Sequence, residues 1–236
     1  MKNFILLPMS CLLSLSLQAQ IPANQHFFTC GADTLHAEML KNNPALTALE
    51  AQQETAYQTA MSVAKKSVGA VVYTLPVVVH IIHNNGAENI SDAQVLKGIG
   101  YLNDAFRNRN YYNPATGVDV EIEFCLAQRD LQGKAFSGIA RYQSPMTDMS
   151  LKLGAPYTLT NWDTKNYINI ILVREACLFG DCSGVAGYAT LPGTHGKPGE
   201  GIVMEAKYFG FNPIETTVLA HEMGHYLGLM HTFQGG

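Results

Sequence analysis

The stretch HEMGHYLGLMH at residues 221–231 carries the most specific pattern in the chain. His221 and His225 are four residues apart, so on a helix both imidazoles project from one face and can bind one Zn²⁺. Glu222 lies beside that face, where a carboxylate can take a proton from zinc-bound water and pass it to a leaving amine. Gly228 lets the chain leave the helix with a positive φ angle, which brings His231 back as a third ligand.

The whole pattern is far more specific than its first half. With eight histidines in 236 residues, H-E-x-x-H arises by chance in about one chain in 80 of this composition. The glycine and the third histidine lower that chance to roughly four in 100,000, which disfavours three unrelated histidines on an apolar helix. Three protein ligands leave one zinc position open, and an open position separates a catalytic zinc site from a structural one.

The composition excludes two other classes of protein. Hydrophobic residues make up 47% of the chain and charged residues only 14%, so the chain is not intrinsically disordered. A net charge of -4 without a run of like charge argues against a nucleic-acid-binding protein. The length allows one large domain or two small ones.

The N-terminus has the features of a secretory signal peptide at residues 1–19. Lys2 precedes an apolar stretch at residues 4–17, and the three residues that end at Ala19 are a plausible cleavage site. We therefore expect a secreted protein, extracellular or periplasmic, without a membrane segment after removal of the signal. A lipoprotein anchored through Cys11 is the weaker alternative, because the residues before Cys11 form a poor lipidation motif.

Residues 20–66 are predicted to form a pro-segment that is mostly helical. Asn43 and Pro44 are typical of a helix start, and apolar residues recur behind them at near-helical spacing, so one amphipathic helix is expected. After Lys65 and Lys66, a basic pair of the kind that proteases cut, the composition changes to β-branched residues. This change places the boundary of the catalytic domain, residues 67–236.

Downstream of this boundary, strand and helix patterns follow one another. Ser91 and Gln94 form a capping box for a helix that ends near Arg109, and Asn212 with Pro213 opens the last helix. This order predicts an α+β fold with a mixed, twisted sheet of about five strands, a backing helix and an active-site helix. The predicted strands are residues 71–83, 118–127, 139–142 (a hairpin-like piece), 167–173, 187–191 (an edge strand) and 201–205; a short helix is predicted at residues 146–153.

Four cysteines remain after removal of the signal, and in an oxidising compartment they allow three pairings that the sequence does not decide. Cys177 and Cys182 are close enough in sequence to close a small loop. Pairing with a cysteine beyond the end of this chain is equally open. The four cysteines are Cys30, Cys125, Cys177 and Cys182.

The chain resembles the metzincin metallopeptidases, and more narrowly the pappalysin group of ulilysin-like and pregnancy-associated plasma protein A-like enzymes. The narrower resemblance rests on HEMGHYLGLMHTFQGG, on GYATLP and GIVMEA, and on LPVVVHIIH followed by NISDAQVLKGIGYLNDAFR. It covers residues 73–236.

The resemblance implies a zincin-like upper subdomain and a zinc-dependent endopeptidase that cleaves protein or peptide substrates. Glu222 would be its general base. The implied zinc ligands are His221, His225 and His231. The implied substrate strand, along which an extended substrate would lie, is Gly187, Tyr188, Ala189 and Thr190.

Cys30, which precedes Gly31 in the pro-segment, has two interpretations. In similar zymogens a pro-segment cysteine occupies the open zinc position as a thiolate, which is a good zinc ligand and keeps the precursor latent. A structural disulfide is the alternative.

Members of the family continue past the third histidine into a lower subdomain with a methionine-containing turn and, in some cases, calcium sites. This chain stops at Gly236, so we expect a form truncated after the zinc motif. The alternative function is then a catalytically incompetent module that binds zinc or substrate. Ca²⁺ is a further candidate cofactor, and Asp181 and Glu200 could ligate it, although no EF-hand-type loop supports this.

Other histidines have a structural interpretation. His80 and His83 lie on a predicted buried strand and are expected to be core residues with hydrogen-bond partners. His195 lies in a loop rich in Gly and Pro and is expected to be exposed.

Overall fold

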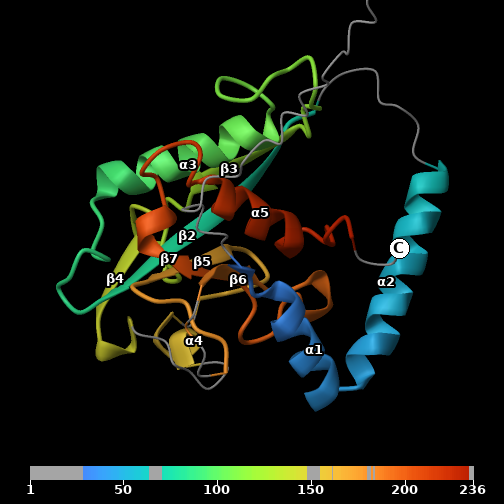
Figure 1. Ribbon diagram of the computed structural model, residues 1–236, viewed down its shortest axis with the longest axis horizontal. Coiled ribbons are helices and arrows are strands. Elements are labelled where there is room, and N and C mark those ends of the chain that lie inside the picture. Colours follow the sequence, from blue (N-terminus) through green and yellow to red (C-terminus); the bar gives the residue numbers. More distant parts are fainter. Residues whose placement is uncertain are drawn as a thin grey trace, which may run out of the picture.

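The computed structural model describes residues 29–63, 71–147, 155–160, 162–179, 182 and 184–233, which build a mixed seven-stranded sheet with helices on both faces (Figure 1). The strand order is β1-β6-β7-β5-β2-β3, and β4 pairs with β2. Among these strands only the β6–β7 pair is antiparallel. The strands are β1 (Thr29–Cys30), β2 (Tyr73–His83), β3 (Ile122–Leu126), β4 (Ile139–Gln143), β5 (Ile168–Val173), β6 (Val185–Ala189) and β7 (Ile202–Glu205).

The predicted α+β class with a mixed sheet, a backing helix and an active-site helix is confirmed. The sheet exceeds the expected five or so strands because the hairpin-like piece forms β4 and because β1 joins at the edge. The helices are α1 (Ala32–Asn42), α2 (Ala45–Val63), α3 (Asp92–Phe106), α4 (Ala155–Thr160) and α5 (Thr217–Tyr226), with 3-10 turns at Pro145–Thr147, Pro192–Thr194 and Ala206–Tyr208.

Two hydrophobic clusters lie on opposite faces of the sheet, because successive side chains of a strand point to opposite sides. On β2, Ile81 packs in the cluster that α3 and α5 cover, whereas Ile82 packs in the cluster that includes Leu35 of α1. Figure 1 shows α3 and α5 on one side of the sheet and α1 and α4 on the other. The sheet is therefore buried on both faces, as its Val- and Ile-rich strands predict.

Helix α3 begins where its cap predicts. The Ser91 hydroxyl accepts a hydrogen bond from the backbone N–H of Gln94 at 3.2 Å. The Gln94 side chain does not complete the capping box but donates to the Phe209 carbonyl at 2.8 Å. This bond ties α3 to the segment that leads into α5.

The strand predicted at residues 118–127 is shorter in the structure. β3 begins only at Ile122, and Val118 is 80% exposed. The backbone turns at Glu121, where φ is 61°, and Asp119 pairs with Arg107 at 2.8 Å. The alternation of apolar residues overestimates this strand because its first half lies in a loop held to the end of α3.

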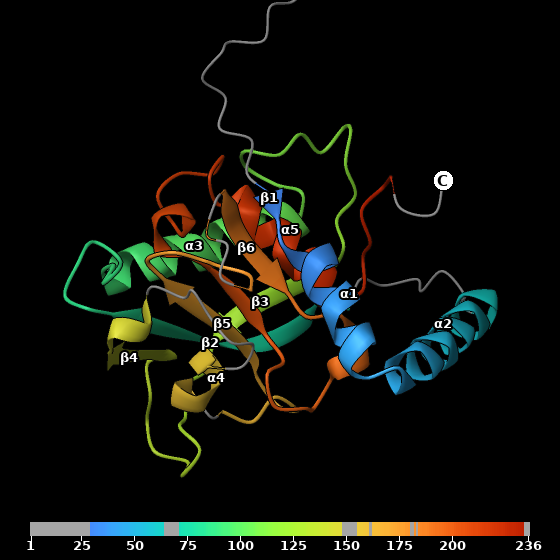
Figure 2. The ribbon, with the colours of Figure 1, turned by 60° about the horizontal axis from the view of Figure 1, so that its bottom comes forward.

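The N-terminal segment contains two helices instead of the one predicted. α1 precedes Asn43 and buries Leu35 against the sheet, and α2 follows and projects away from the body of the molecule (Figure 2). Leu46 of α2 is buried, but Tyr57 and Met61 are 56% and 57% exposed. The described residues therefore cover little of the apolar surface of α2.

The strand predicted to lie at the sheet edge, residues 187–191, is internal in this chain. It corresponds to β6, which pairs with β7 on one side and with β1 on the other. Cys30 is in register with Gly187, and the N–H of Gly31 donates to the Gly187 carbonyl at 3.0 Å. The prediction is wrong for the chain as it stands because it did not include a strand as short as β1.

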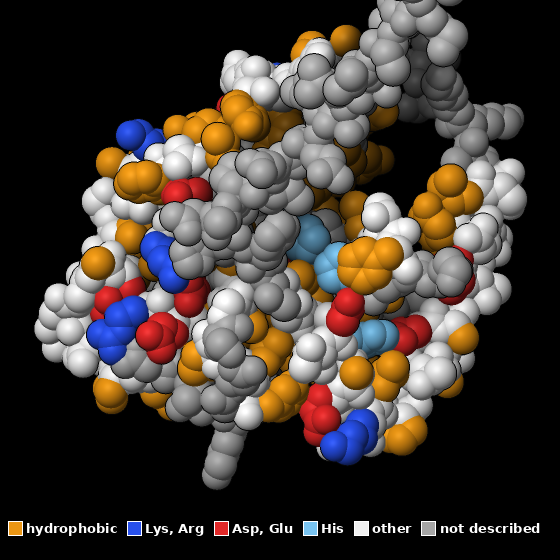
Figure 3. Space-filling model, in the orientation of Figure 1, with side chains coloured by type: hydrophobic (Ala, Val, Ile, Leu, Met, Phe, Trp, Pro, Cys, Tyr) orange, Lys and Arg blue, Asp and Glu red, His pale blue; other side chains and the backbone are white. Residues whose placement is uncertain are grey.

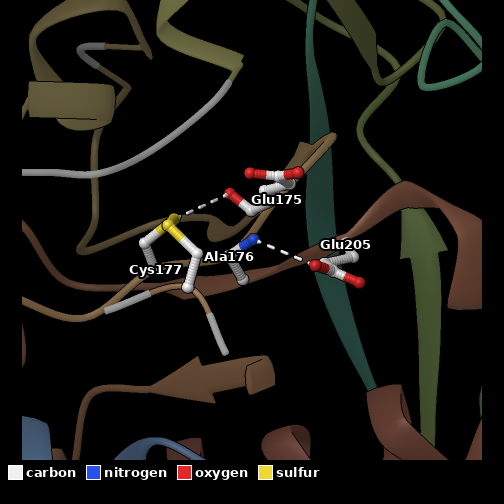
Figure 4. The surroundings of a disulfide bond; sticks show 5 residues. Glu175, Ala176, Cys177 and Glu205 are labelled. Carbon is white, nitrogen blue, oxygen red and sulfur yellow. Dashed lines mark hydrogen bonds between the residues drawn. A yellow bond between two sulfur atoms is a disulfide. The ribbon is translucent and has the colours of Figure 1, made fainter. Parts of the chain in front are cut away.

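Cys177 and Cys182 form a disulfide that closes the loop between β5 and β6 (Figure 4). Beside it the N–H of Ala176 donates to the Glu205 carboxylate at 3.4 Å. The small-loop alternative is therefore the one present, and Cys30 and Cys125 are free thiols.

Some predictions fall outside the described residues. They are the signal peptide at residues 1–19, the domain boundary after Lys66, and most of the short helix at residues 146–153. None of the described helices is long and apolar enough to span a membrane.

His80 is a core histidine with partners, as predicted. Its Nε2–H donates to the Asn169 amide oxygen at 2.9 Å, and its Nδ1 lies 3.2 Å from the Tyr142 hydroxyl. Burial lowers the pKa of His80 to about 4, against the upward effect of the Asn169 hydrogen bond. The folded state therefore holds this ring neutral at pH values at which the unfolded chain protonates it.

We predict that His80 makes the fold sensitive to acid. Between the unfolded pKa of about 6.5 and the folded pKa of about 4, falling pH favours the unfolded chain, by about 2–3 kcal/mol at pH 4.5. The free energy of unfolding of metal-free protein, measured by urea titration, should thus fall more steeply between pH 7 and 4.5 in wild type than in His80→Gln. Parallel curves would contradict the prediction, and His195→Gln, at a side chain 61% exposed, is the control.

Candidate metal centre

Helix α5 packs against the core with the face that is turned toward the sheet. Leu219 and Met223 are fully buried in the cluster shared with α3 and the sheet. Glu222 and His225 are also almost completely buried, whereas His221 lies on the open side. The packing of Leu219 and Met223 thus fixes the rotation of α5 and the direction of its polar side chains.

The turn after α5 brings His231 back to the helix, as the glycine predicts. Gly228 has a φ of 101°, its N–H donates to the His225 carbonyl at 2.9 Å, and the N–H of Leu229 donates to the Gly224 carbonyl at 2.8 Å. A Cβ atom at Gly228 would lie 3.3 Å from Pro192. The position therefore favours glycine for both its φ angle and its close neighbour.

The three histidines converge on one point through their Nε2 atoms. The Nε2 atoms of His221 and His225 are 3.0 Å apart, and each of them is 3.2 Å from Nε2 of His231. Ligand nitrogens about 2.0 Å from a tetrahedral zinc are about 3.3 Å from one another. The separation thus fits three corners of a zinc coordination tetrahedron.

The partners of the distal ring nitrogens favour a cation between the three rings. His225 Nδ1 donates to the Leu229 carbonyl at 2.7 Å, and His231 Nδ1 donates to the Asp33 carboxylate at 3.0 Å. Both partners accept, so in each neutral ring the proton is on Nδ1 and Nε2 carries a lone pair. Burial, and the neighbouring histidines after it, lower the pKa of His221 and of His225, which favours neutral rings. Facing lone pairs at 3.2 Å repel unless a cation lies between them.

Cys30 supplies a fourth donor from the N-terminal segment. Its Sγ and the ring nitrogens of the three histidines all lie within 4.8 Å of one another. Burial raises the pKa of the Cys30 thiol to about 12, with the nearby Glu222 carboxylate as the next cause. A thiolate at this position therefore requires a positive charge beside it, which a bound Zn²⁺ would provide.

Glu222 lies beside the metal-ligand cluster and is 1% exposed. Burial raises its pKa to about 8, and its Oε2 atom is 3.8 Å from Cys30 Sγ. A Cβ atom on Gly187 would lie 3.0 Å from Met204 and 3.4 Å from the Glu222 side chain. The glycine in β6 therefore lets the sheet approach this carboxylate closely.

An open cleft of about 580 Å³ runs past these groups. Figure 3 shows histidine side chains in pale blue at the centre of one face, next to an acidic and a hydrophobic side chain. The wall of the cleft includes Ala186 of β6 and Val218 of α5. The expected substrate residues Gly187, Tyr188 and Ala189 lie on β6, and Thr190 follows directly after it.

Two residues near the metal ligands were not predicted from the sequence. Asp33 accepts the hydrogen bond from His231, and the ring of Phe233 stacks on the His231 ring at 4.9 Å. No local pattern marks Asp33, because its partner lies 198 residues away in sequence. Phe233 is two positions after His231 in the sequence, but no sequence pattern predicts that the two rings stack.

The calcium interpretation finds no support at Glu200. Its buried carboxylate already accepts hydrogen bonds from the Tyr226 hydroxyl and the N–H of Gly196, both at 2.5 Å, and lies 3.0 Å from His195 Nδ1. It joins the end of α5 to the loop after β6 and is not open to a cation. Asp181 lies outside the described residues.

The family comparison points to peptidases. Residues 157–236 match a peptidase family whose description is pregnancy-associated plasma protein-A. No curated protein matches the chain significantly in sequence.

Two similar solved structures come from Tannerella forsythia. A promirolysin variant is 31% identical with a TM-score of 0.65, and the match covers 86% of this chain and 69% of promirolysin. Mature mirolysin in complex with a cleaved peptide is 33% identical with a TM-score of 0.59, over 69% of this chain and 66% of mirolysin. The chain thus spans about two thirds of the length of these relatives.

Gly228 provides a test of the turn that carries His231. We predict that Gly228→Ala raises the dissociation constant for Zn²⁺ and costs about 1–3 kcal/mol of stability, because an L-residue is strained at this φ angle. Gly100→Ala is the matched control, since nothing lies within 4 Å of its Cβ position on α3. Chelator competition gives the zinc affinity; wild-type affinity in Gly228→Ala would show that the glycine is not needed to position His231.

Proposed function

Because the chain belongs to the pregnancy-associated plasma protein-A family of zinc metallopeptidases, we propose that it is a secreted endopeptidase made as a latent precursor. The observation that carries the proposal is the convergence of three imidazole Nε2 atoms, 3.0–3.2 Å apart, next to a buried carboxylate. The predicted signal peptide supports export, and the disulfide between Cys177 and Cys182 agrees with an oxidising compartment.

His221, His225 and His231 would hold the zinc ion. Two of these rings have their tautomers fixed by acceptors at Nδ1, which leaves Nε2 free to bind the metal. Zinc, when bound, activates water and polarises the carbonyl of the scissile peptide bond. The donor set fits this ion because zinc is typically bound by imidazole and thiolate in tetrahedral geometry.

Glu222 would act as the general base and acid. Its carboxylate accepts the proton of the attacking water and then returns it to the amine of the leaving product. A carboxyl group beside the metal can do both. Burial raises the pKa of Glu222 in the metal-free chain, and a bound zinc ion would favour its charged form, which is the form that accepts the proton. The close approach allowed by Gly187 keeps this carboxylate between α5 and β6.

The substrate would lie extended along β6. In the precursor the outer side of β6 is occupied by β1, and the Gly187 carbonyl accepts a hydrogen bond from Gly31. Once the N-terminal segment leaves, β6 becomes the sheet edge and this carbonyl can bind a substrate N–H. That mature mirolysin was solved with a cleaved peptide supports a peptide substrate for a relative of this fold.

The N-terminal segment would keep the precursor latent in two ways. Cys30 takes the fourth position among the zinc donors, where it excludes the catalytic water, and β1 takes the edge of β6. The comparison supports a pro-segment, because the covered share of this chain is 86% with promirolysin but 69% with mature mirolysin.

Replacement of the base should separate chemistry from metal binding. We predict that Glu222→Gln retains zinc but lowers peptide cleavage by at least about 100-fold after removal of the N-terminal segment, because proton transfer is lost. Glu175→Gln, at an exposed carboxylate beside the disulfide, is the control. A Glu222→Gln variant that cleaves casein at the wild-type rate would overturn the role of this residue. A wild-type protein that binds zinc but cleaves no peptide would favour the non-catalytic module.

Cys30 provides a test of latency. We predict that Cys30→Ala is processed faster than wild type when the purified precursor is incubated with zinc, because the open metal position becomes available to water. Electrophoresis over time measures the processing, and Cys125→Ala removes the exposed free thiol as a matched control. Equal processing of Cys30→Ala and wild type would exclude a cysteine-based latency.

A further inference from the structure

We propose that Asp33 of the N-terminal segment orients the third zinc ligand, His231, so that the precursor binds zinc more tightly than the same chain without this carboxylate. The inference rests on the zinc site proposed above. It concerns metal affinity and is separate from latency, because it does not require Cys30 to block the metal.

The contact joins the two ends of the chain. Asp33 Oδ2 accepts a hydrogen bond from His231 Nδ1 at 3.0 Å, and the His231 side chain is only 10% exposed. This Nδ1 atom is on the side of the ring away from the metal position, which Nε2 faces. Asp33 therefore touches the ligand and leaves the metal position free.

The place of Asp33 is fixed by the packing around it. It lies in the first turn of α1, directly after the β1 strand that pairs with β6. A Cβ atom on Gly31 would lie 2.3 Å from Leu178, so the chain approaches the body of the protein closely here. Two residues after Asp33, the Leu35 side chain is 3% exposed. The carboxylate is thus presented by an anchored backbone.

His231 differs from His225 in the source of its support. His225 Nδ1 donates to the Leu229 carbonyl, which belongs to the same helix and turn. His231 lies beyond the turn, where Leu229 and Met230 are 67% and 49% exposed, and its ring stacks on the ring of Phe233. The acceptor of its Nδ1–H group, Asp33, belongs to the N-terminal segment. When that segment leaves, His231 loses this bond, whereas His225 keeps its own.

A carboxylate that accepts a hydrogen bond from a metal-binding histidine has well-established effects. It fixes the tautomer and the ring orientation of a metal-binding histidine and raises the basicity of the ligand, and its loss typically costs about 10–100-fold in metal affinity. The Asp33 side chain is 43% exposed, so solvent weakens its charge and the lower end of this range applies. The consequence is that the chain would bind zinc most tightly while the N-terminal segment is still attached.

The experiment measures zinc affinity in the full chain by competition with a chelator. Wild type, Asp33→Asn and Glu38→Gln are compared, and Glu38 is the matched control because it lies on the same helix and interacts with Lys41 and Asn42. We expect Asp33→Asn to raise the dissociation constant for Zn²⁺ about 10-fold and Glu38→Gln to leave it unchanged. The same comparison in a Cys30→Ser background should again give about 10-fold.

A second measurement separates ligand orientation from the stability of α1. The melting temperature is determined with and without zinc, and we expect Asp33→Asn to reduce the rise caused by zinc. A loss of the same size in metal-free and zinc-bound protein would show that Asp33 only stabilises the helix, and would overturn the proposal. An unchanged dissociation constant would also overturn it. If His225→Ala bound zinc as wild type does, the metal site itself would be wrong, which is a distinct result.

Discussion

Facing lone pairs on imidazole nitrogens are the constraint on which the site depends. The distal nitrogens of His225 and His231 donate to a carbonyl and a carboxylate, so their Nε2 atoms, 3.2 Å apart, both present electron pairs. With both rings neutral, this arrangement favours a cation between the two nitrogens, and the fold brings the two rings together. Leu219 and Met223 fix the rotation of α5, and the turn at Gly228 returns His231. The packing of the core thus positions a site that a divalent metal would complete.

One strand edge would connect the proposed latency with the proposed substrate binding. β6 is the last strand of the body of the sheet, and the N-terminal segment covers it with β1, which also carries Cys30 to the metal ligands. The same two-residue strand therefore occupies the proposed place of the substrate backbone and the proposed place of the catalytic water. A latent state built in this way needs few contacts, since β1 and the first turn of α1 reach every group that the reaction would use.

The sequence predicted most of what local chemistry determines. The zinc-helix pattern identified His221, Glu222, His225 and His231, and the cap at Ser91 located the start of α3. Local sequence patterns could not predict contacts between distant segments. β1 has two residues, too few for any periodicity, and Asp33 meets His231 across 198 positions. At residues 118–127 the alternating pattern was present, but the ion pair of Asp119 with Arg107 holds its first half in a loop.

In the proposed precursor, three histidines and Cys30 bind one zinc ion. X-ray absorption at the zinc edge of the full chain can detect this ligand set, because zinc–nitrogen and zinc–sulfur distances differ. We expect one zinc per chain, with three nitrogen ligands at about 2.0–2.1 Å and one sulfur at about 2.3 Å. A first shell without sulfur, or one made mainly of oxygen, would contradict it.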